Sequence, residues 1–203
     1  SFTDAGDYPY TIKGIGQYVF EITGTYEIKP YEYNITTSDE SKAWDGSALT
    51  GSGTIANATP TGIKPQGLVT FTATGESVLL VMQGSQTAVG SSDNTYKLFW
   101  AGETSGIYVP TAAKGNYKLD TEKLGTLSVT AVYDINSTQP EKGGSFTVTK
   151  EDGSTATKAP EGTKIILTPS DPSTGYTFDK FVVKDAYNNP VTVNYDAEKN
   201  EYS

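Results

Sequence analysis

The side chains most often used for chemistry in proteins are missing from this chain of 203 residues. It has no cysteine and no histidine, and all 15 of its basic residues are lysine. A thiol nucleophile, a disulfide and a histidine-activated serine are therefore excluded. Carboxylates remain, and a pair such as Asp171 and Asp179 would suffice for glycoside hydrolysis. Because carboxylates scattered over a threonine-rich β-surface are usually solvated charge, the sequence predicts no enzyme, no catalytic residue and no cofactor.

Two stretches offer oxygen ligands for calcium. They are "SSDNTY" at residues 91–96 and "SDPSTG" at residues 170–175. Neither has the dense acidic spacing of a dedicated calcium loop, and both are more typical of Asx turns. We therefore expect no metal site. A crosslink between lysine and asparagine, found in bacterial surface domains of similar build, would need a buried Lys, Asn and carboxylate together, and the sequence alone does not locate such a set.

The stretch "SKAWDGSAL" at residues 41–49 places Trp44 beside an Asp-Gly turn signal. In the structural interpretation Trp44 is a buried anchor that closes a small β-domain, and Asp45 and Gly46 form the adjoining turn. The alternative is an exposed aromatic platform for a sugar ring, made of Trp44, Trp100, Tyr108 and Tyr117. We favour the buried anchor, because aromatic side chains usually fill small cores before they form sites.

The formal charge of -9 and the isoelectric point near 4.5 argue against two classes of partner. An acidic surface repels both a nucleic-acid backbone and an anionic bilayer, so we expect neither partner. The sequence also lacks an apolar run long enough to span a membrane, which predicts no membrane insertion in this segment. Abundant Thr, Gly and Tyr with no Cys favours a secreted or cell-surface bacterial protein, outside the cell or in its wall.

Alternating apolar and polar residues predict β-strands along the whole chain, with almost no helical pattern. The turn formers between them, such as Asp-Gly and Asn-Asn-Pro, predict short connections. "VTKEDGSTAT" at residues 148–157 predicts a hairpin, and the apolar run "SVLLVM" at 77–82 predicts a strand buried on both faces, with a short helix as the alternative. The other expected strands cover residues 8–12, 18–22, 26–28, 69–73, 96–100, 127–131, 146–148, 165–167, 181–183 and 191–195.

An internal repeat organises the first two thirds of the chain. "AGDYPYTIKGIGQYVFEITGTYEIKP" at residues 5–30 is matched by a longer version at 88–131, which carries the insertion "AGETSGIYVPTAAK". Both copies have a small residue and Gly before a strand, then Gly-x-Tyr, and then Gly-Thr before a final strand. Such self-similarity is typical of tandem modules. It predicts that residues 1–30 are the closing strands of a module whose opening half is absent.

The middle of the chain resembles a known family. "NITTSDESKAWDGSALTGSGTI", "GLVTFTATG", "QTAVGSSDNTYKL" and "GNYKLDTEKLGTLSVTA" are similar, in this order, to the YDG and MBG-type repeats of bacterial surface proteins and adhesins. The resemblance covers residues 31–131, with the end of a preceding copy at 1–30. Trp44 stands where that family generally has Tyr. The resemblance implies a structural signature of Lys42, Trp44, Asp45, Gly46 and Leu49.

Residues 132–203 resemble a different repeat. "GGSFTVTKEDGSTATKAPEGTKIILTPSDPSTGYTFDKFVVKDAYNNPVTV" is similar to the divergent internalin B-type bacterial repeat. That family continues into a further strand, so we expect this last domain to be incomplete at its C-terminal edge. The resemblance implies a spacer and display module and identifies no ligand.

Together these features predict an all-β chain of tandem modules in an elongated array. Each module is expected to be a small immunoglobulin-like β-sandwich or a β-grasp-like sheet. We expect a non-catalytic stalk or display segment of an adhesin-like protein, whose partners are the neighbouring modules of its own polypeptide. The alternative is a module that binds glycan or host protein through exposed aromatic side chains of residues 31–131.

Overall fold

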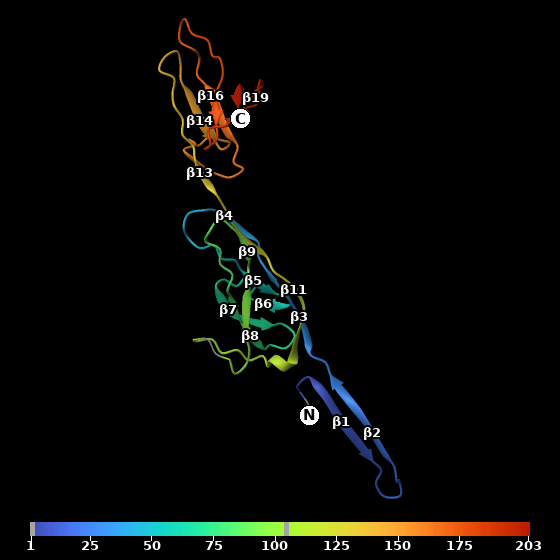
Figure 1. Ribbon diagram of the computed structural model, residues 1–203. Helices are drawn as coiled ribbons and strands as arrows, with labels where there is room; N and C mark the ends of the chain where they lie inside the picture. Colours follow the sequence, from blue (N-terminus) through green and yellow to red (C-terminus); the bar gives the residue numbers. More distant parts are fainter. Residues whose placement is uncertain (1–2, 104–105) are drawn as a thin grey trace. The chain divides into compact units, whose positions relative to one another are not determined.

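The computed structural model describes residues 3–103 and 106–203, and the regular secondary structure of these residues is almost entirely β-strand (Figure 1). The described residues form twenty strands and one short 3-10 helix, η1 (Lys114–Asn116). This confirms the all-β prediction. The chain divides into two compact units, Ser1–Val129 and Thr130–Ser203.

The first unit begins with a two-stranded antiparallel ribbon of β1 (Gly6–Lys13) and β2 (Glu21–Ile28). Eight consecutive residue pairs connect the strands, from Gly6 with Ile28 to Lys13 with Glu21. The prediction of a strand over 18–22 is wrong in its boundary, since β2 starts only at Glu21. Residues 14–20 form the connection instead, closed by a hydrogen bond of 2.9 Å from the Gly14 amide to the Phe20 carbonyl.

The rest of the first unit is a module of three small sheets, in which its first two strands, β3 and β4, lie beside its last two, β11 and β12 (Figure 1). The sheet orders are β11-β3-β5, β10-β8-β7-β6 and β4-β12-β9, and β11 runs parallel to β3. The strands are β3 (Tyr31–Thr37), β4 (Glu40–Ala43), β5 (Gly53–Ile55), β6 (Ala58–Thr59), β7 (Gln66–Phe71), β8 (Ser77–Met82), β9 (Gly90–Asp93), β10 (Tyr96–Phe99), β11 (Tyr117–Lys123) and β12 (Thr126–Thr130).

The core of this module is built from alternate residues of its strands. Ile35 of β3 and Ile55 of β5 meet Val69 and Phe71 of β7 in one apolar cluster, to which Leu80 of β8 also belongs. The run "SVLLVM" is β8 and not a helix, with Val78, Leu79 and Leu80 all buried. Its continuous apolar pattern is explained by this burial on both faces.

The ribbon repeats the register of two strands in the module. In the ribbon Gly6 pairs with Ile28 and Tyr8 with Tyr26, and in the module Gly90 pairs with Val129 and Ser92 with Leu127. The intervening pair, Asp7 with Glu27, likewise matches Ser91 with Ser128. Both copies start at a glycine with positive φ, 152° in the ribbon and 131° in the module. The internal repeat is therefore a repeat of structure as well as of sequence.

The second unit contains three further sheets, with strand orders β13-β15, β14-β16-β20-β19 and β17-β18. The hairpin predicted at 148–157 forms, with Thr149 bridging Thr155 around Gly153. The strand predicted at 191–195 is two short strands, because β18 pairs with β17 and β19 with β20. The strands are β13 (Val132–Asp134), β14 (Phe146–Lys150), β15 (Lys158–Pro160), β16 (Ile165–Pro169), β17 (Val183–Lys184), β18 (Pro190–Val191), β19 (Tyr195–Asp196) and β20 (Glu201–Tyr202).

Candidate functional site

The signature residues at 42–49 form a hydrogen-bonded turn at the end of β4. Lys42 Nζ donates to Asp45 Oδ1 at 2.5 Å and to the carbonyl oxygen of Ser47 at 2.6 Å. The Ser47 amide donates to Asp45 Oδ1 at 2.8 Å, and Gly46 takes a φ of 82°. Leu49 then returns to the module through paired backbone hydrogen bonds with Gln86. The turn is thus held by side chains of its own residues.

The charges of this turn set the protonation of Asp45. The hydrogen bond from Lys42, followed by those from the Ser47 amide and hydroxyl, lowers the pKa of the Asp45 carboxyl well below its usual range. The carboxylate therefore stays ionised and keeps the turn closed over the whole neutral range. An ionised carboxylate has no proton to donate, so Asp45 does not act as a general acid near neutral pH.

Trp44 lies in this turn but is not buried. Its side chain is 51% exposed, so the prediction that Trp44 is a buried anchor is wrong. The turn is closed by the ion pair of Lys42 with Asp45, which needs no apolar plug, and the indole is left at the surface. The sequence could not reveal this, because the Lys-Asp pair and the tryptophan share the same turn and either could have organised it.

The other tryptophan has the role that was expected of Trp44. Trp100 is 5% exposed and its ring lies against the edge of Tyr33, with centroids 5.9 Å apart, and against Tyr117 at 5.5 Å. Tyr117 also stacks on Phe71 at 4.4 Å. The predicted platform of Trp44, Trp100, Tyr108 and Tyr117 does not form, because Trp100 and Tyr117 are core residues and Tyr108 is half-buried.

The hydroxyl of Tyr117 finds partners at the edge of this core. It donates to Glu76 Oε2 at 2.7 Å and lies 2.7 Å from the hydroxyl of Thr74. Burial, followed by the hydrogen bond to Glu76, raises the pKa of Tyr117 to about 12. Tyr117 is therefore a neutral hydrogen-bond donor that connects β11 to the turn between β7 and β8.

A clamp of side-chain hydrogen bonds connects the opening strands β3 and β4 to the closing strands β11 and β12. The Gly125 amide donates to Thr37 Oγ1 at 2.8 Å, and the Thr126 amide donates to Asp39 Oδ1 at 2.7 Å. Asn34 Oδ1 accepts from both the amide and the hydroxyl of Thr121, at 3.0 and 2.7 Å. These partners are 87 or 88 residues apart in sequence, so no local pattern could have found them.

Asn94 closes the clamp from the side of β9. Its side chain is completely buried, and Nδ2 donates to the carbonyl oxygen of Ser38 at 3.0 Å and to that of Ser52 at 3.3 Å. Its backbone amide donates to Gly125 at 2.8 Å. The stretch 91–96, considered above for calcium, thus supplies a structural asparagine. Across residues 3–103 and 106–203, no group of three or more acidic side chains is placed to hold a metal ion.

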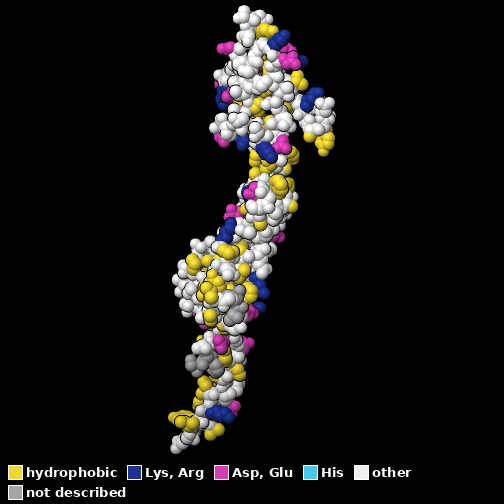
Figure 2. Space-filling model, turned by 90° about the vertical axis from the view of Figure 1, so that its left-hand side faces the viewer, with side chains coloured by type: hydrophobic (Ala, Val, Ile, Leu, Met, Phe, Trp, Pro, Cys, Tyr) yellow, Lys and Arg dark blue, Asp and Glu magenta, His cyan; other side chains and the backbone are white. Residues whose placement is uncertain are grey.

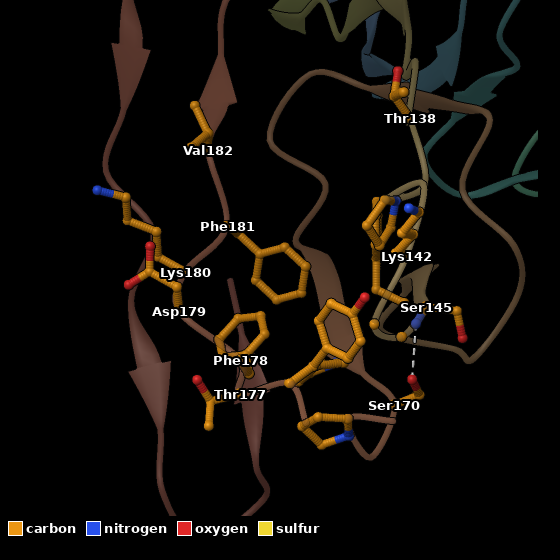
Figure 3. A pocket seen from close by; sticks show the side chains of 17 residues that line it. Thr138, Lys142, Ser145, Ser170, Thr177, Phe178, Asp179, Lys180, Phe181 and Val182 are labelled. Carbon is orange, nitrogen blue, oxygen red and sulfur yellow. Dashed lines mark hydrogen bonds between the residues drawn. The ribbon is translucent and has the colours of Figure 1, made fainter. Parts of the chain in front are cut away.

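The second unit contains a pocket that the sequence did not predict (Figure 3). It has a volume of about 390 Å³, and the rings of Phe178 and Phe181 face it from one side while Lys142 lies on the other. A hydrogen bond of 2.9 Å from the Ser145 amide to Ser170 Oγ supports the far wall. A second hollow of about 780 Å³ shares Phe181 with it. The only hint in the sequence is the aromatic density of "GYTFDKF".

This pocket belongs to a loosely covered aromatic cluster. Phe181 contacts Phe146, Phe178 and Tyr202 with ring centroids 5.1 to 5.3 Å apart. The buried apolar residues described in this unit are few, namely Val148, Ala156, Ala159 and Ile166. Asp179 of the suggested carboxylate pair points away from the rings in Figure 3, and Asp171 is exposed as well.

The isopeptide crosslink and the membrane-spanning segment considered from the sequence find no support among the described residues. In the part of the chain that is described, the buried polar residues are Thr37 and Asn94, and lysine is not among them, so a buried lysine for an isopeptide crosslink is not found there. Within the same described ranges, no helix has the length and apolar character needed to cross a bilayer. Comparisons of the chain with protein-family models, with curated protein sequences and with solved structures find no match.

Proposed function

We propose that this chain is a non-catalytic segment of a secreted or cell-surface bacterial protein of the adhesin type. In this proposal small β-sandwich modules follow one another along the polypeptide and act as a stalk that spaces and displays other domains. The observation that carries the proposal is the parallel pairing of β3 with β11, the first and the closing strands of the module.

Parallel pairing decides how such a module responds to a pulling force. The chain enters at the start of β3 and leaves at the end of β12, so the two ends lie at opposite ends of the paired strands (Figure 1). A force along the polypeptide then loads all hydrogen bonds between β3 and β11 in shear at once. Strands pulled apart from one end would instead lose their hydrogen bonds one at a time. A module that resists force in this way suits a stalk.

The clamp adds to this resistance. Lys118 forms an ion pair with Glu32 at 3.0 Å across the two parallel strands, and Asn34 receives its two hydrogen bonds from Thr121 across the same seam. Each side-chain bond crosses from an opening strand to a closing strand. The interactions that must break first under shear are therefore the ones that the module has reinforced.

Single-molecule force spectroscopy tests this proposal directly. Because the chain has no cysteine, handles can be attached at engineered pairs, Lys29→Cys with Thr130→Cys for shear and Lys29→Cys with Lys114→Cys for peeling from one end. We expect the shear pair to unfold at a force severalfold higher than the peeling pair. Equal forces for the two pairs would contradict the stalk function, because the strand arrangement would then confer no mechanical advantage.

The second candidate function is binding of glycan or host protein through residues 31–131. The exposed indole of Trp44 favours it, since it is a large aromatic surface held on a rigid turn. The test is glycan-array binding by the chain and by its Trp44→Ala variant, with Val89→Ala as the matched exposed control. Binding that is lost only with Trp44 supports this candidate, and absence of binding by the unaltered chain contradicts it.

A further inference from the structure

The strand pair β1 and β2 of the ribbon corresponds to the pair β9 and β12 of the module, but β12 has one more neighbouring strand than β2. In the module β12 lies between β9 and β4, whereas β2 belongs to a sheet of two strands. The apolar side chains reflect this difference. Tyr26 of β2 is 59% exposed, while Leu127, which holds the same register position in β12, is completely buried. Figure 2 shows hydrophobic side chains gathered over the ribbon.

β2 keeps the Gly-Thr pair that, at Gly125 and Thr126, contacts the end of β3 and the residues before β4 in the module. Gly125, the residue immediately before β12, must be glycine because a Cβ there would meet the Ser38 carbonyl oxygen at 2.2 Å. The ribbon has Gly24 at this position, although the atoms nearest to a Cβ on Gly24 are those of the Tyr10 ring, at 2.5 Å. That ring belongs to a side chain that can rotate away, whereas the neighbour of Gly125 is backbone. A glycine at position 24 is therefore explained best by the close approach of another strand.

We propose that the outer edge of β2 is an acceptor site for a β-strand of the Tyr31–Ala43 type, supplied by the opening half of another repeat of this kind. The incoming strand runs parallel to β2. The amide of Thr25 faces this outer edge, and the Asp of the incoming strand binds it, as Asp39 binds the amide of Thr126 in the module. The apolar residues of the incoming strand cover Tyr26, which completes a module around the ribbon.

The strand that binds the edge of β2 is identified by how its residues align with Gly24 and Thr25, and not by its apolar side chains alone. Strand addition at an open edge satisfies the backbone of any extended peptide. The space above Gly24 and the outward amide of Thr25 favour a strand that carries Asp where β3 and β4 are joined by Asp39. A second copy of this chain does not supply that strand, because its own β3 and β4 are already held by β11 and β12. Strand binding at the edge of β2 does not depend on the proposed stalk function, because this edge can accept a strand whether or not the module resists force.

A grafted chain tests the acceptor site. Residues 31–89 are joined directly to Gly6, so that Gly6 takes the place of Gly90 and the full chain follows. We expect the amides of residues 21–28 to exchange with deuterium at least a hundredfold more slowly than in the chain without the graft. The matched control carries Ile35→Asp in the grafted copy alone, which places a charge at a core position and should abolish the protection.

The direction of the added strand relative to β2 can be measured independently with nitroxide labels. A nitroxide on the first residue of the graft should broaden the amide signals near Glu21, and one placed after grafted Ala43 should broaden those near Ile28. The reverse pattern means antiparallel addition and overturns the proposal. Unchanged exchange at residues 21–28 while residues 31–129 of the chain remain folded overturns it too. So does a dimer of the ungrafted chain in which these amides are already protected.

Discussion

Replacing each of the two tryptophans should lower the stability of the module by a different amount. Comparing the two variants tests whether Trp100 is a core residue and Trp44 a surface residue. Trp100→Ala removes a side chain that is 5% exposed and touches the rings of Tyr33 and Tyr117. Deletion of a buried aromatic side chain costs about 3–5 kcal/mol, because the transfer energy is lost and a cavity remains. We expect this variant to lose that much of the unfolding free energy of residues 31–129.

Trp44→Ala should cost much less. A covered tryptophan buries about 200 Å², and Trp44 is 51% exposed, so roughly 100 Å² of apolar surface is at stake. At about 25 cal/mol per Å² the upper bound is about 2.5 kcal/mol. The measured cost should fall below this bound, because water fills the vacated space and no cavity forms.

Urea denaturation followed by circular dichroism measures both costs. The Trp100→Phe variant provides a further check, since it leaves Trp44 as the only tryptophan, and acrylamide should quench its emission efficiently. Equal loss of stability in the two alanine variants would refute the reasoning. A protected indole in the Trp100→Phe variant would refute it as well, because Trp44 would then be a core residue.

Three further predictions concern the module. Its unfolding free energy should fall as the pH rises from about 10 through 12, since the pKa of Tyr117 is raised to about 12 and the unfolded chain loses this proton first; the raised pKa values of Tyr96 and Tyr33 act in the same direction, and a pH series of urea melts measures the fall. Gly125→Ala should destabilise strongly by clashing with Ser38, whereas Gly115→Ala, with open space at its Cβ, should be nearly neutral in the same melts. Asp45→Asn should open the turn, seen as faster amide exchange at residues 44–48 with an unchanged midpoint for the module.

Strand positions were predicted well where one face of a strand is buried and the other solvated. The alternation at residues 146–148 and 165–167, for example, led to β14 and β16. The prediction was wrong where an aromatic pattern continued into a turn, as at Tyr18 and Phe20, because period-two spacing does not show where backbone pairing stops. Burial of the individual aromatics was the weakest inference. Trp44 and Trp100 each stand near a glycine and polar residues, and only their distant neighbours distinguish them.

By itself the sequence determined which reactive side chains the protein lacks and that its first two thirds contain an internal repeat. A chain without Cys, His and Arg has no thiol chemistry and no histidine base, whatever its fold. A small residue with Gly, and later Gly-Thr, occur in the same order in both copies, and this order predicted the repeat that the shared register of the two strand pairs bears out. Such properties follow from residue type and local order, which the sequence states directly.

Only the tertiary structure decided which strands become neighbours and which side chains they cover. The parallel pairing of β3 with β11 and the bonds of Thr37 and Asn94 to strands far along the chain are contacts between segments separated by tens of residues. Local propensity is the same whether β12 has one neighbour or two. The open edge of β2 and the filled edge of β12 therefore follow from closely similar local sequences, and the difference between them lies in whether an opening strand is present to cover them.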